Sequence, residues 1–560
     1  MGYNEFYISF NHIFLTFILF YSRDTLKWQS RFVYGEGLYL QKGIRLFASV
    51  LSAAISGMEV CPVQVEADVS SGLPCFTMVG FPSTQVKEAQ DRVRTALKNN
   101  GISLPPKKVT VNLAPADLRK EGAGFDLPVA AAVLAASGFI EPQLLRNVMV
   151  VGELSLNGEV RSVSGVLPRV IRARELGCRY CIIPFENLAE GALVKDMKVV
   201  GVQNIKEVLK LVSDPDAFGK ENQFSEENSE ENSEENQAEE NLLDFGEICG
   251  QESARRAAEI AVSGFHNILF IGPPGTGKTM LAKRIPTIMP SLTFEESLEL
   301  TKIYSIAGLL SSKRPLIKAR PFRSPHHTSS SAALAGGGRI PGPGEVTLAH
   351  RGVLFLDEMP EFARGSLEVL RQPLEDKQIQ LSRASGTYVF PAGFILVAAM
   401  NPCPCGYYPD MNKCRCTPGE VSHYLHKLSQ PLLERIDLCA DVPPVNFSQI
   451  SGEKSGESSA LIRKRVEKAR RIQQKRYQNE KICFNGELSG KQIRKYCVLT
   501  ENAFQVAKNA FELMELSARS YHRILKVSRT IADMEGEELI HTRHVAEALT
   551  YKAFDKKYRS

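Results

Sequence analysis

The sequence predicts an α/β protein that consists of two successive α/β domains followed by a helical C-terminal region. Segments with strand-like and helix-like periodicity alternate along residues 46–212. A buried strand then runs into a glycine-rich loop at residues 267–279. After residue 501, apolar side chains recur at helical spacing, as in Phe504, Ala507, Ala510, Phe511 and Met514. A chain of 560 residues is also too long for one hydrophobic core, which agrees with several domains.

The first α/β domain is expected at residues 46–212. Val63–Val69 alternates between apolar and polar side chains, as a half-buried strand does. Val86–Asn99 predicts a helix with one polar face, and the Ala- and Val-rich segment Pro128–Ala136 predicts a buried helix. Further strands are expected at Val109–Leu113, Val148–Gly152 and Tyr180–Pro184.

A linker is expected at residues 213–243, where the tetrapeptide SEEN occurs three times. Such hydrophilic, highly charged sequence cannot bury enough apolar surface to offset the entropy of ordering. The second α/β domain is expected at residues 244–444 and the helical domain at residues 445–560. Residues 1–45 contain the only Trp, Trp28, and many other aromatic residues. We interpret them as a non-native or poorly ordered extension and expect translation to start near Leu46.

The net charge of +5 hides two regions of opposite charge. Residues 221–240 contain nine Glu and no Lys or Arg, so the rest of the chain carries +14. A basic body suits a polyanion such as nucleic acid, but a soluble enzyme with an acidic linker shows the same balance. The twelve Cys have no secretory context, which argues against a disulfide scaffold. No stretch reaches the ~20 apolar residues that cross a bilayer, so no membrane partner is expected.

A strand predicted at Asn267–Ile271 leads directly into the pattern G-x-x-x-x-G-K-[ST]. The glycines of such a loop let backbone N–H groups close around phosphate oxygens at a helix N-terminus. Lys278 is expected to reach the β- and γ-phosphates of ATP, and the Thr279 hydroxyl to bind Mg²⁺. An ATP-dependent protein is expected in the cytoplasm. The predicted nucleotide-binding residues are Gly272, Pro273, Pro274, Gly275, Thr276, Gly277, Lys278 and Thr279.

Gly352–Leu356 predicts a second buried strand, which is followed by Asp357 and Glu358. Asp357 is expected to hold Mg²⁺, directly or through water, and Glu358 to orient and deprotonate the attacking water. A carboxylate pair after a strand also caps helices, but the phosphate loop upstream favours the catalytic interpretation.

The motifs that follow resemble those of AAA+ ATPases. A third buried strand ends in Asn401, at the position called sensor 1, which contacts the γ-phosphate or the attacking water. Arg435 resembles an arginine finger, which acts on the ATP of a neighbouring subunit and therefore requires a ring. The alternative for Arg435 is a surface ion pair with Glu434 or Asp437.

Two further positions resemble AAA+ nucleotide contacts. Arg519 matches sensor 2 of the helicase-like branch, and Arg523 is the second choice for that role. Ile248–Gln251 resembles the segment that packs on adenine, so Gln251 is included among the nucleotide-binding residues.

Three longer stretches are more specific: PFRSPHHTSSSAALAGGG at 321–338, PGPGEVTLAHRGVLFLDEMPEF at 341–362 and AAMNPCPCGYY at 398–408. With them, residues 46–560 closely resemble the YifB/ComM family of magnesium-chelatase-like AAA+ ATPases. The resemblance implies a Lon-like N-terminal α/β domain, an AAA+ core, a helical lid and a hexameric ring. It also implies relatedness to the replicative MCM helicases and, for ComM-type members, a role in DNA branch migration during natural transformation.

The Lon-like domain departs from Lon proteases at their catalytic Ser–Lys dyad. Gly124 occupies the place of the serine nucleophile, and Leu167 the place of the lysine. A nucleophile without a side-chain oxygen cannot attack a peptide bond. We therefore expect this domain to be non-proteolytic and to serve as a platform for assembly or for DNA.

Four cysteines form the pattern C-x-C-x₈-C-x-C in an insert at residues 403–416. They are Cys403, Cys405, Cys414 and Cys416. Four thiolates in this short segment can surround Zn²⁺ tetrahedrally, although structural zinc sites favour C-x₂-C. Unmetallated cysteines and a redox role are the alternatives, and His423 is a candidate replacement for one ligand.

Candidate DNA contacts are basic residues in loops and on one helix. Arg339 lies in the Gly- and Pro-rich loop Ala335–Gly344, and Arg383 lies near the turn of a hairpin predicted at residues 377–390. Both arginines are either pore contacts to phosphates or ordinary solvated side chains. The basic helix Ala460–Asn479 is expected to lie on a phosphate backbone, to face solvent or to contact a neighbouring subunit.

Together, these motifs predict an ATP-hydrolysing ring motor that acts on DNA. The alternative is a chelatase-type ATPase that remodels a protein or assists metal insertion, but the sequence contains no integrin-like domain to receive such a partner. A Lon-like protease is disfavoured by the missing dyad.

Overall fold

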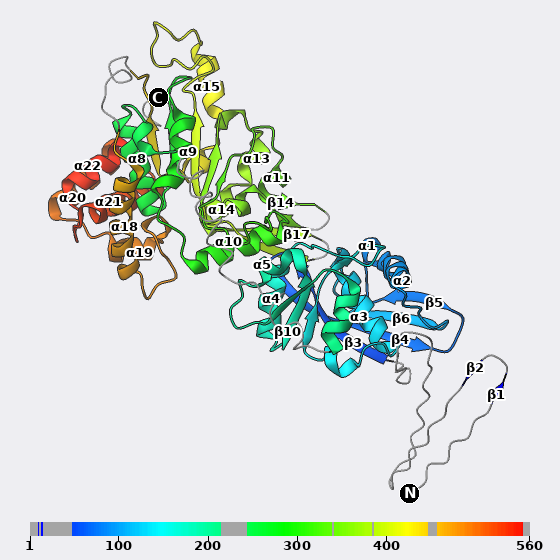
Figure 1. Ribbon diagram of the computed structural model, residues 1–560. Helices are drawn as coiled ribbons and strands as arrows, with labels where there is room; N and C mark the ends of the chain where they lie inside the picture. Colours follow the sequence, from blue (N-terminus) through cyan, green and yellow to red (C-terminus); the bar gives the residue numbers. More distant parts are fainter. Residues whose placement is uncertain are drawn as a thin grey trace. The chain divides into compact units, whose positions relative to one another are not determined.

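The computed structural model describes residues 9–10, 13–14, 47–213, 243–338, 341–383, 386–445 and 456–552. The chain divides into two compact units, formed mostly by residues 47–213 and 243–552. In Figure 1, each unit is a sheet with helices packed against it. The predictions for the N-terminal extension and the acidic linker fall almost entirely outside the described residues. Of the extension, only the short strands β1 (Ser9–Phe10) and β2 (Ile13–Phe14) are described.

The first unit contains a seven-stranded mixed sheet with the strand order β11-β10-β7-β3-β4-β6-β5. The pairs β3–β4 and β4–β6 are antiparallel, whereas the other neighbours in this sheet are parallel. The four strands predicted in this region are confirmed, with ends that differ by a few residues. The strands are β3 (Phe47–Ser56), β4 (Glu59–Ser70), β5 (Cys75–Val79), β6 (Lys108–Ala114), β7 (Val148–Val150), β10 (Tyr180–Pro184) and β11 (Val199–Val202). The pair β8 (Glu153–Leu154) and β9 (Val160–Arg161) lies outside this sheet.

The most deeply buried helix of the first unit is α3, which packs on β3 and β4. All of its residues are buried, as predicted from its Ala- and Val-rich sequence. Its one charged residue, Asp126, accepts a 2.7 Å hydrogen bond from Arg92 Nε, which compensates the buried charge. The helix predicted at 86–99 is divided at Glu88. The helices are α1 (Thr84–Lys87), α2 (Ala89–Asn99), α3 (Asp126–Ala136), α4 (Val166–Glu175), α5 (Leu188–Gly191) and α6 (Ile205–Ser213).

The second unit contains a five-stranded parallel sheet with the order β13-β16-β19-β12-β20. Residues of β12, β16 and β19 are all buried, because helices cover both faces of a parallel sheet. The three strands predicted around the nucleotide motifs are confirmed. The strands are β12 (Ile268–Ile271), β13 (Phe322–Arg323), β16 (Val353–Leu356), β19 (Ile395–Met400) and β20 (Leu438–Asp441).

Two small hairpins accompany this sheet. β14 (Gly336–Gly337) pairs with β15 (Gly342–Pro343), and β17 (Gln378–Arg383) pairs with β18 (Gly386–Pro391). The second pair confirms the hairpin predicted at 377–390, with Arg383 opposite Gly386. Arg339 and residues 384–385 lie outside the described residues.

Helices from both predicted regions of the second unit share one apolar core. α18 and α21 pack on α8, and α18 also packs on α9. The helices before residue 445 are α8 (Glu252–Gly264), α9 (Lys278–Ile288), α10 (Phe294–Ile306), α11 (Ser331–Ala335), α12 (Glu345–Leu348), α13 (Arg364–Glu368), α14 (Arg371–Asp376), α15 (Pro418–His426) and α16 (Gln430–Leu433). Those after it are α18 (Ser459–Arg476), α19 (Gly490–Tyr496), α20 (Glu501–Leu513), α21 (Ala518–Glu535) and α22 (Thr542–Thr550).

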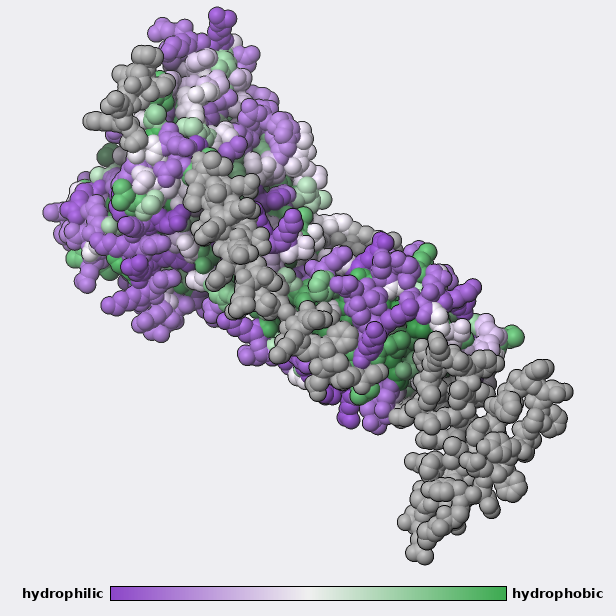
Figure 2. Space-filling view, viewed as in Figure 1, coloured by the Kyte–Doolittle hydropathy of each residue, from purple (hydrophilic) through white to green (hydrophobic). Residues whose placement is uncertain are grey.

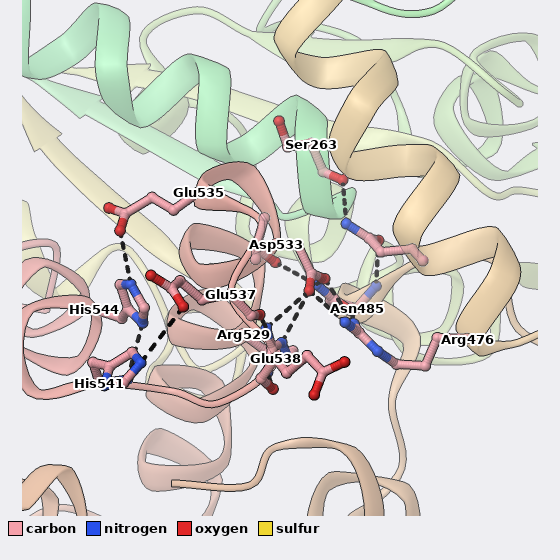
Figure 3. Close-up of polar contacts among 12 residues, drawn as sticks. Ser263, Arg476, Asn485, Arg529, Asp533, Glu535, Glu537, Glu538, His541 and His544 are labelled. Carbon is pink, nitrogen blue, oxygen red and sulfur yellow. Dashed lines mark hydrogen bonds and ion pairs between the residues drawn. The ribbon is translucent and has the colours of Figure 1, made fainter. Parts of the chain in front are cut away.

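A buried polar network connects the C-terminal helices (Figure 3). Its centre is Asp533 on α21, which is fully buried. The Asp533 carboxylate accepts hydrogen bonds from Arg476 Nη1 at 2.7 Å, Arg529 Nε at 3.1 Å and Asn485 Nδ2 at 2.8 Å. Two guanidinium groups and an amide therefore satisfy one buried carboxylate and fix α18 against α21.

The surface in view is mostly hydrophilic, with apolar side chains scattered across it (Figure 2). Within the described ranges, no helix is both long and apolar enough to span a bilayer.

Candidate functional site

The phosphate loop joins β12 to α9, at the carboxyl end of the parallel sheet. Gly275 and Gly277 have φ angles of +77° and +90°, in the left-handed region that favours glycine. A Cβ on Gly272 would lie 2.1 Å from the Val442 carbonyl oxygen, so this position also excludes a side chain. The loop ends at Lys278, the first residue of α9, where the positive end of the helix dipole favours phosphate.

Lys278 connects the phosphate loop to the end of β19. Its Nζ donates to the carbonyl oxygens of Gly272 and Pro273, both at 2.8 Å, and to Asn401 Oδ1 at 3.1 Å. Burial lowers the pKa of Lys278, while the nearby carboxylates of Asp357 and Glu358 oppose that shift. The structure thus brings three of the predicted site residues, Lys278, Asn401 and Asp357, to one place.

The two predicted Mg²⁺ ligands are adjacent. Thr279 Oγ1 donates a 2.7 Å hydrogen bond to Asp357 Oδ2, so a hydroxyl and a carboxylate oxygen face the same point. These are the oxygen ligands that Mg²⁺ takes alongside nucleotide phosphates. The residues present therefore fit an ATP–Mg²⁺ complex.

Glu358 follows Asp357 in an unusual backbone conformation. Its φ and ψ are both 48°, a left-handed conformation that costs a non-glycine residue about 1 kcal/mol or more. Its backbone N–H donates to Asp357 Oδ1 at 3.0 Å, and its side chain is exposed. This turn places the Glu358 carboxylate on the wall of a cavity that Asn401 also lines.

That cavity has a volume of about 530 Å³ and extends from the catalytic end of the sheet to α15. Its wall also includes Tyr424 and Lys427. Lys427 forms a 3.1 Å ion pair with Glu361, and burial raises the pKa of Tyr424. The sequence motifs do not identify Tyr424 and Lys427, because both residues lie outside the strand–loop segments that carry the motifs. The full lining is Glu358, Glu361, Asn401, Pro404, Gly419, Glu420, His423, Tyr424 and Lys427.

Gln251 lies at the N-terminus of α8, beside the phosphate loop. Its Nε2 donates to the Pro443 carbonyl at 2.6 Å and to the Thr276 carbonyl at 3.4 Å. Gln251 therefore ties the entry of the domain to the loop. Its predicted contact with adenine stays a prediction.

Arg435 lies at the amino end of the strands, opposite to the carboxyl end where the phosphate loop begins. Its carbonyl oxygen accepts a 2.8 Å hydrogen bond from Asn267 Nδ2, immediately before β12 begins. The phosphate loop begins where β12 ends, and four strand residues span about 13 Å. The two parts of the predicted catalytic machinery therefore lie at opposite ends of one strand.

The side chains of Arg435 and Arg519 meet at Glu375 on α14. Arg435 Nη2 pairs closely with Glu375 Oε2, and Arg519 Nη2 lies 3.4 Å from Glu375 Oε1. The predicted alternative for Arg435 was an ion pair with Glu434 or Asp437. The ion pair in the structure is with Glu375, which lies too far away in the sequence for proximity to identify it. Arg523 is buried and donates to the Leu433 and Ile436 carbonyls, so this second choice has a structural set of partners.

The four cysteines of the insert lie together. Their Sγ atoms are all within 4.8 Å of one another, and His423 is not a member of this group. Backbone hydrogen bonding near Tyr407 lowers the pKa of the Cys405 thiol to about 6. The cluster directly follows Asn401 in the chain.

In the first unit, Gly124 and Leu167, which are predicted to correspond to the Lon dyad, lie among structural contacts. A Cβ on Gly124 would face Val151 and Val163. Leu167 is fully buried, and its backbone N–H donates to Glu190 Oε1 at 2.8 Å. Arg169 is buried nearby and bonded to backbone carbonyls, and burial lowers its pKa to about 10.

A parallel sheet with this phosphate loop, the Asp–Glu pair and a polar residue on the intervening strand defines a P-loop ATPase of the AAA+ class. Comparisons with known proteins give the narrower group. Family models match residues 244–450 (Magnesium chelatase, subunit ChlI), 65–187 (Subunit ChlI of Mg-chelatase) and 456–552 (Magnesium chelatase, subunit ChlI C-terminal).

Full-length relatives agree with the family models. The chain is 44% identical over 510 residues to Competence protein ComM of Haemophilus influenzae. This match covers 90% of this chain and 97% of that protein. It is 42% identical over 508 residues to the protein YifB of Escherichia coli, again covering 90% and 97%. A shorter match, 31% over 172 residues, relates 29% of the chain to DNA repair protein RadA of Listeria monocytogenes. The chain belongs to the YifB/ComM family of magnesium-chelatase-like AAA+ ATPases.

Proposed function

We propose that this chain hydrolyses ATP in a homo-oligomeric ring, most simply a hexamer, and uses the energy to move along DNA, as a branch-migration helicase or translocase does. The observation that carries the ring is the separation of Lys278 and Glu358 from Arg435 and Arg519 by the length of β12. A single chain cannot bring these arginines to its own γ-phosphate. A neighbour that presents its Glu375 edge to the phosphate loop completes the site.

Within this proposal, each site residue has a defined role. The phosphate loop binds the β- and γ-phosphates through backbone N–H groups and Lys278. Bound Mg²⁺, held by Thr279 and Asp357, supplies charge neutralisation for the phosphate oxygens. Glu358 accepts a proton from the attacking water, and Asn401 orients that water or the γ-phosphate. Arg435 and Arg519 of the neighbour stabilise negative charge on the transferred phosphoryl group.

The proposed DNA contacts come from two surfaces. On α18, the exposed cations Lys464, Lys468, Arg471 and Lys475 recur at spacings of three and four residues, which places them on one helix face. Arg383 lies in the second hairpin, and its Nη2 is 3.5 Å from the position of a Cβ on Gly337. The two hairpins thus come together, as the proposed pore contacts require. Phosphate contacts of this kind give affinity with little sequence preference.

The test is ATP hydrolysis by the full-length protein with and without forked or four-way-junction DNA. We expect DNA to stimulate ATP hydrolysis. The stimulation should fall steeply between 50 and 200 mM salt, roughly as counterion release requires. Lys278→Ala should abolish hydrolysis. Electron microscopy with ATP should display closed rings. Salt-insensitive hydrolysis that DNA leaves unchanged would contradict the DNA proposal, and a monomer with nucleotide bound would contradict the ring.

A second candidate is a chelatase-type remodelling ATPase with a protein substrate, because all three matching family models describe magnesium chelatase. This function predicts ring assembly and hydrolysis that respond to a protein partner and not to DNA. The same hydrolysis assay separates the two. ATP and Mg²⁺ serve either function, and the proposal adds Zn²⁺ as a structural ion at the four cysteines.

A further inference from the structure

We infer that Cys403, Cys405, Cys414 and Cys416 form a structural zinc site that holds the phosphate loop in position, so that ATP affinity depends on bound zinc. The inference rests on the proposed ATPase function and gives the zinc site a role in nucleotide binding. It is carried by the arrangement of the four sulfurs and by a direct backbone contact between this cluster and Pro274.

The spacing of the sulfurs fits one tetrahedral ion. Cys403 Sγ lies 3.4 Å from Cys405 Sγ and 3.8 Å from Cys414 Sγ, and the Cys405–Cys414 distance is 3.6 Å. Four sulfurs bound tetrahedrally at about 2.3 Å from Zn²⁺ lie about 3.8 Å apart. Three of the sulfurs therefore lie at separations close to tetrahedral, and the Cys416 sulfur lies within 4.8 Å of each of them. The pattern C-x-C-x₈-C-x-C gives this arrangement although its spacing differs from C-x₂-C.

Backbone N–H groups orient one of the four sulfurs. Cys403 Sγ accepts from Gly406 N at 3.2 Å and from Tyr408 N at 3.4 Å. Cys403 is fully buried, and Cys414 is buried as well. Buried cysteines that only fill space need no such donors, whereas ligands of a metal are commonly oriented by hydrogen bonds from surrounding groups.

The cluster touches the phosphate loop directly. Gly406 has a φ of +87°, and a Cβ at this position would lie 2.5 Å from Pro274 Cδ and 3.6 Å from Pro274 N. The Gly406 backbone therefore packs against the loop that binds the phosphates. On its other side, Cys403 follows Asn401 by two residues, and Asn401 accepts a hydrogen bond from Lys278.

A bound metal would hold the segment that carries Gly406 in place against Pro274. Residues 402–417 contain neither a helix nor a strand, so regular backbone hydrogen bonding does not hold them. An ion bound to both ends of this segment closes it and removes conformational freedom, as structural zinc does in small domains. Loss of zinc therefore frees Gly406 from Pro274 and loosens the phosphate loop.

The experiment measures zinc and nucleotide binding separately on the full-length protein. Inductively coupled plasma mass spectrometry is expected to find about one zinc per chain. In Cys405→Ser/Cys416→Ser, zinc should be lost and the Kd for a fluorescent ATP analogue should rise roughly tenfold, as expected for a misplaced binding loop. Cys483→Ser, at an exposed cysteine outside the cluster, should change neither quantity.

Gly406→Ala distinguishes the effect of the zinc ligands from the effect of the contact between Gly406 and Pro274. All four cysteines remain, so zinc should stay bound, while the added Cβ should displace Pro274 and raise the Kd for the nucleotide to a similar extent. This variant keeps the inference testable if the cysteine variant fails to fold.

Two results would overturn the inference. Wild-type protein without zinc, whether its cysteines react freely or form a disulfide, removes the metal site. If the double cysteine variant loses zinc, or Gly406→Ala retains it, and the Kd for the nucleotide does not change, then the zinc site is not linked to the phosphate loop. Zinc content and nucleotide binding are both measured without hydrolysis or DNA. Both measurements therefore remain valid even if the protein proves not to act on DNA. A wild-type chain that holds zinc but binds no ATP would instead contradict the proposed ATPase.

Discussion

Among single residues, Asp437 is held in its charged form immediately before β20. Its Oδ2 accepts a 3.1 Å hydrogen bond from the Asn267 backbone N–H and lies 3.6 Å from His266 Nδ1. Burial by itself raises the pKa of Asp437, but His266, Lys526 and Arg523 outweigh burial and bring the pKa to about 2. This carboxylate anchors the segment that positions Arg435, so its charge state matters for the predicted finger.

The sign of the pH dependence follows from that shift. The folded-state pKa lies below the ordinary value of about 3.9, so the charged carboxylate stabilises the fold above pH 4 and this contribution is lost as the pH falls toward 2. We expect Asp437→Asn to lower the free energy of unfolding by about 2 kcal/mol at pH 7 and by about half as much at pH 3. Urea unfolding followed by circular dichroism at both pH values measures the difference. Asp376→Asn, at an exposed carboxylate, is the control and should have little effect at either pH.

The residues predicted from the sequence were those that belong to contiguous motifs. The phosphate loop and the Asp–Glu pair each form within a few residues of a buried strand, so local pattern and strand order place them together. Glu375, Tyr424 and Lys427 were missed because their positions depend on how α14 and α15 pack, which no local spacing encodes. Local spacing likewise does not tell which of Arg519 and Arg523 is buried.

Among the helices, α18 divides its cations between internal pairs and an exposed face. Arg465 pairs with Glu259, Arg470 with Glu296 at 3.0 Å and Arg476 with Asp533. These arginines hold α18 to the rest of the second unit, so they are not free to bind DNA. The sequence alone left phosphate binding, solvation and subunit contact equally open, because charge spacing does not tell which cations have internal partners.

The exposed face of α18 gives the next prediction. Lys464→Ala/Lys475→Ala removes two cations without touching the internal pairs, so folding and DNA-independent hydrolysis should be retained. We expect weaker DNA binding and a log–log salt slope that is less steep by roughly two, one unit for each lost phosphate contact. Fluorescence anisotropy across a salt series measures both. Lys491→Ala/Lys508→Ala carries the same charge change at exposed lysines elsewhere, and an equal loss of affinity in this control would contradict a specific role for α18.

The Asp533 network in Figure 3 predicts how firmly α18 and α21 are joined. Asp533→Ala leaves the buried Arg529 and the half-buried Arg476 without their carboxylate, so we expect a loss of about 3–5 kcal/mol in the free energy of unfolding of the second unit. Glu537→Ala removes an exposed partner of Arg543 and should cost less than about 1 kcal/mol. Chemical denaturation of both variants provides the comparison, and equal losses would mean that the buried pairs contribute no more than a surface pair.

The α20 helix marks a limit of prediction from periodicity. The helix itself was predicted and is confirmed at Glu501–Leu513. Its buried residues are Ala503 and Ala507, whereas Phe504 and Phe511 are 48% and 41% exposed. Periodicity identified the helical spacing of the apolar residues, but which of them pack inside the unit depends on neighbouring helices that lie far away in the sequence.

At the scale of the whole molecule, the sheet itself separates the catalytic parts. Because β12 and β20 are parallel and in register, Arg435 before β20 must lie beside the start of β12, far from the loop that follows β12. The sequence order of the motifs does not reveal this separation, since strand order and direction are properties of the sheet. Under the proposed function, this separation means that activity depends on contact between chains.

Mixing two inactive variants tests that dependence. Lys278→Ala lacks a working phosphate loop but keeps Arg435, whereas Arg435→Ala keeps the loop but lacks the finger. If the arginine acts across the contact, randomly mixed rings contain sites with an intact loop beside an intact finger, and hydrolysis should recover to about a quarter of the wild-type rate. Arg435→Ala mixed with the double variant Lys278→Ala/Arg435→Ala has no finger to share and should remain inactive. If both mixtures remain inactive while rings still form, Arg435 does not act in trans, and the Glu375 edge must contact something other than the neighbour's nucleotide.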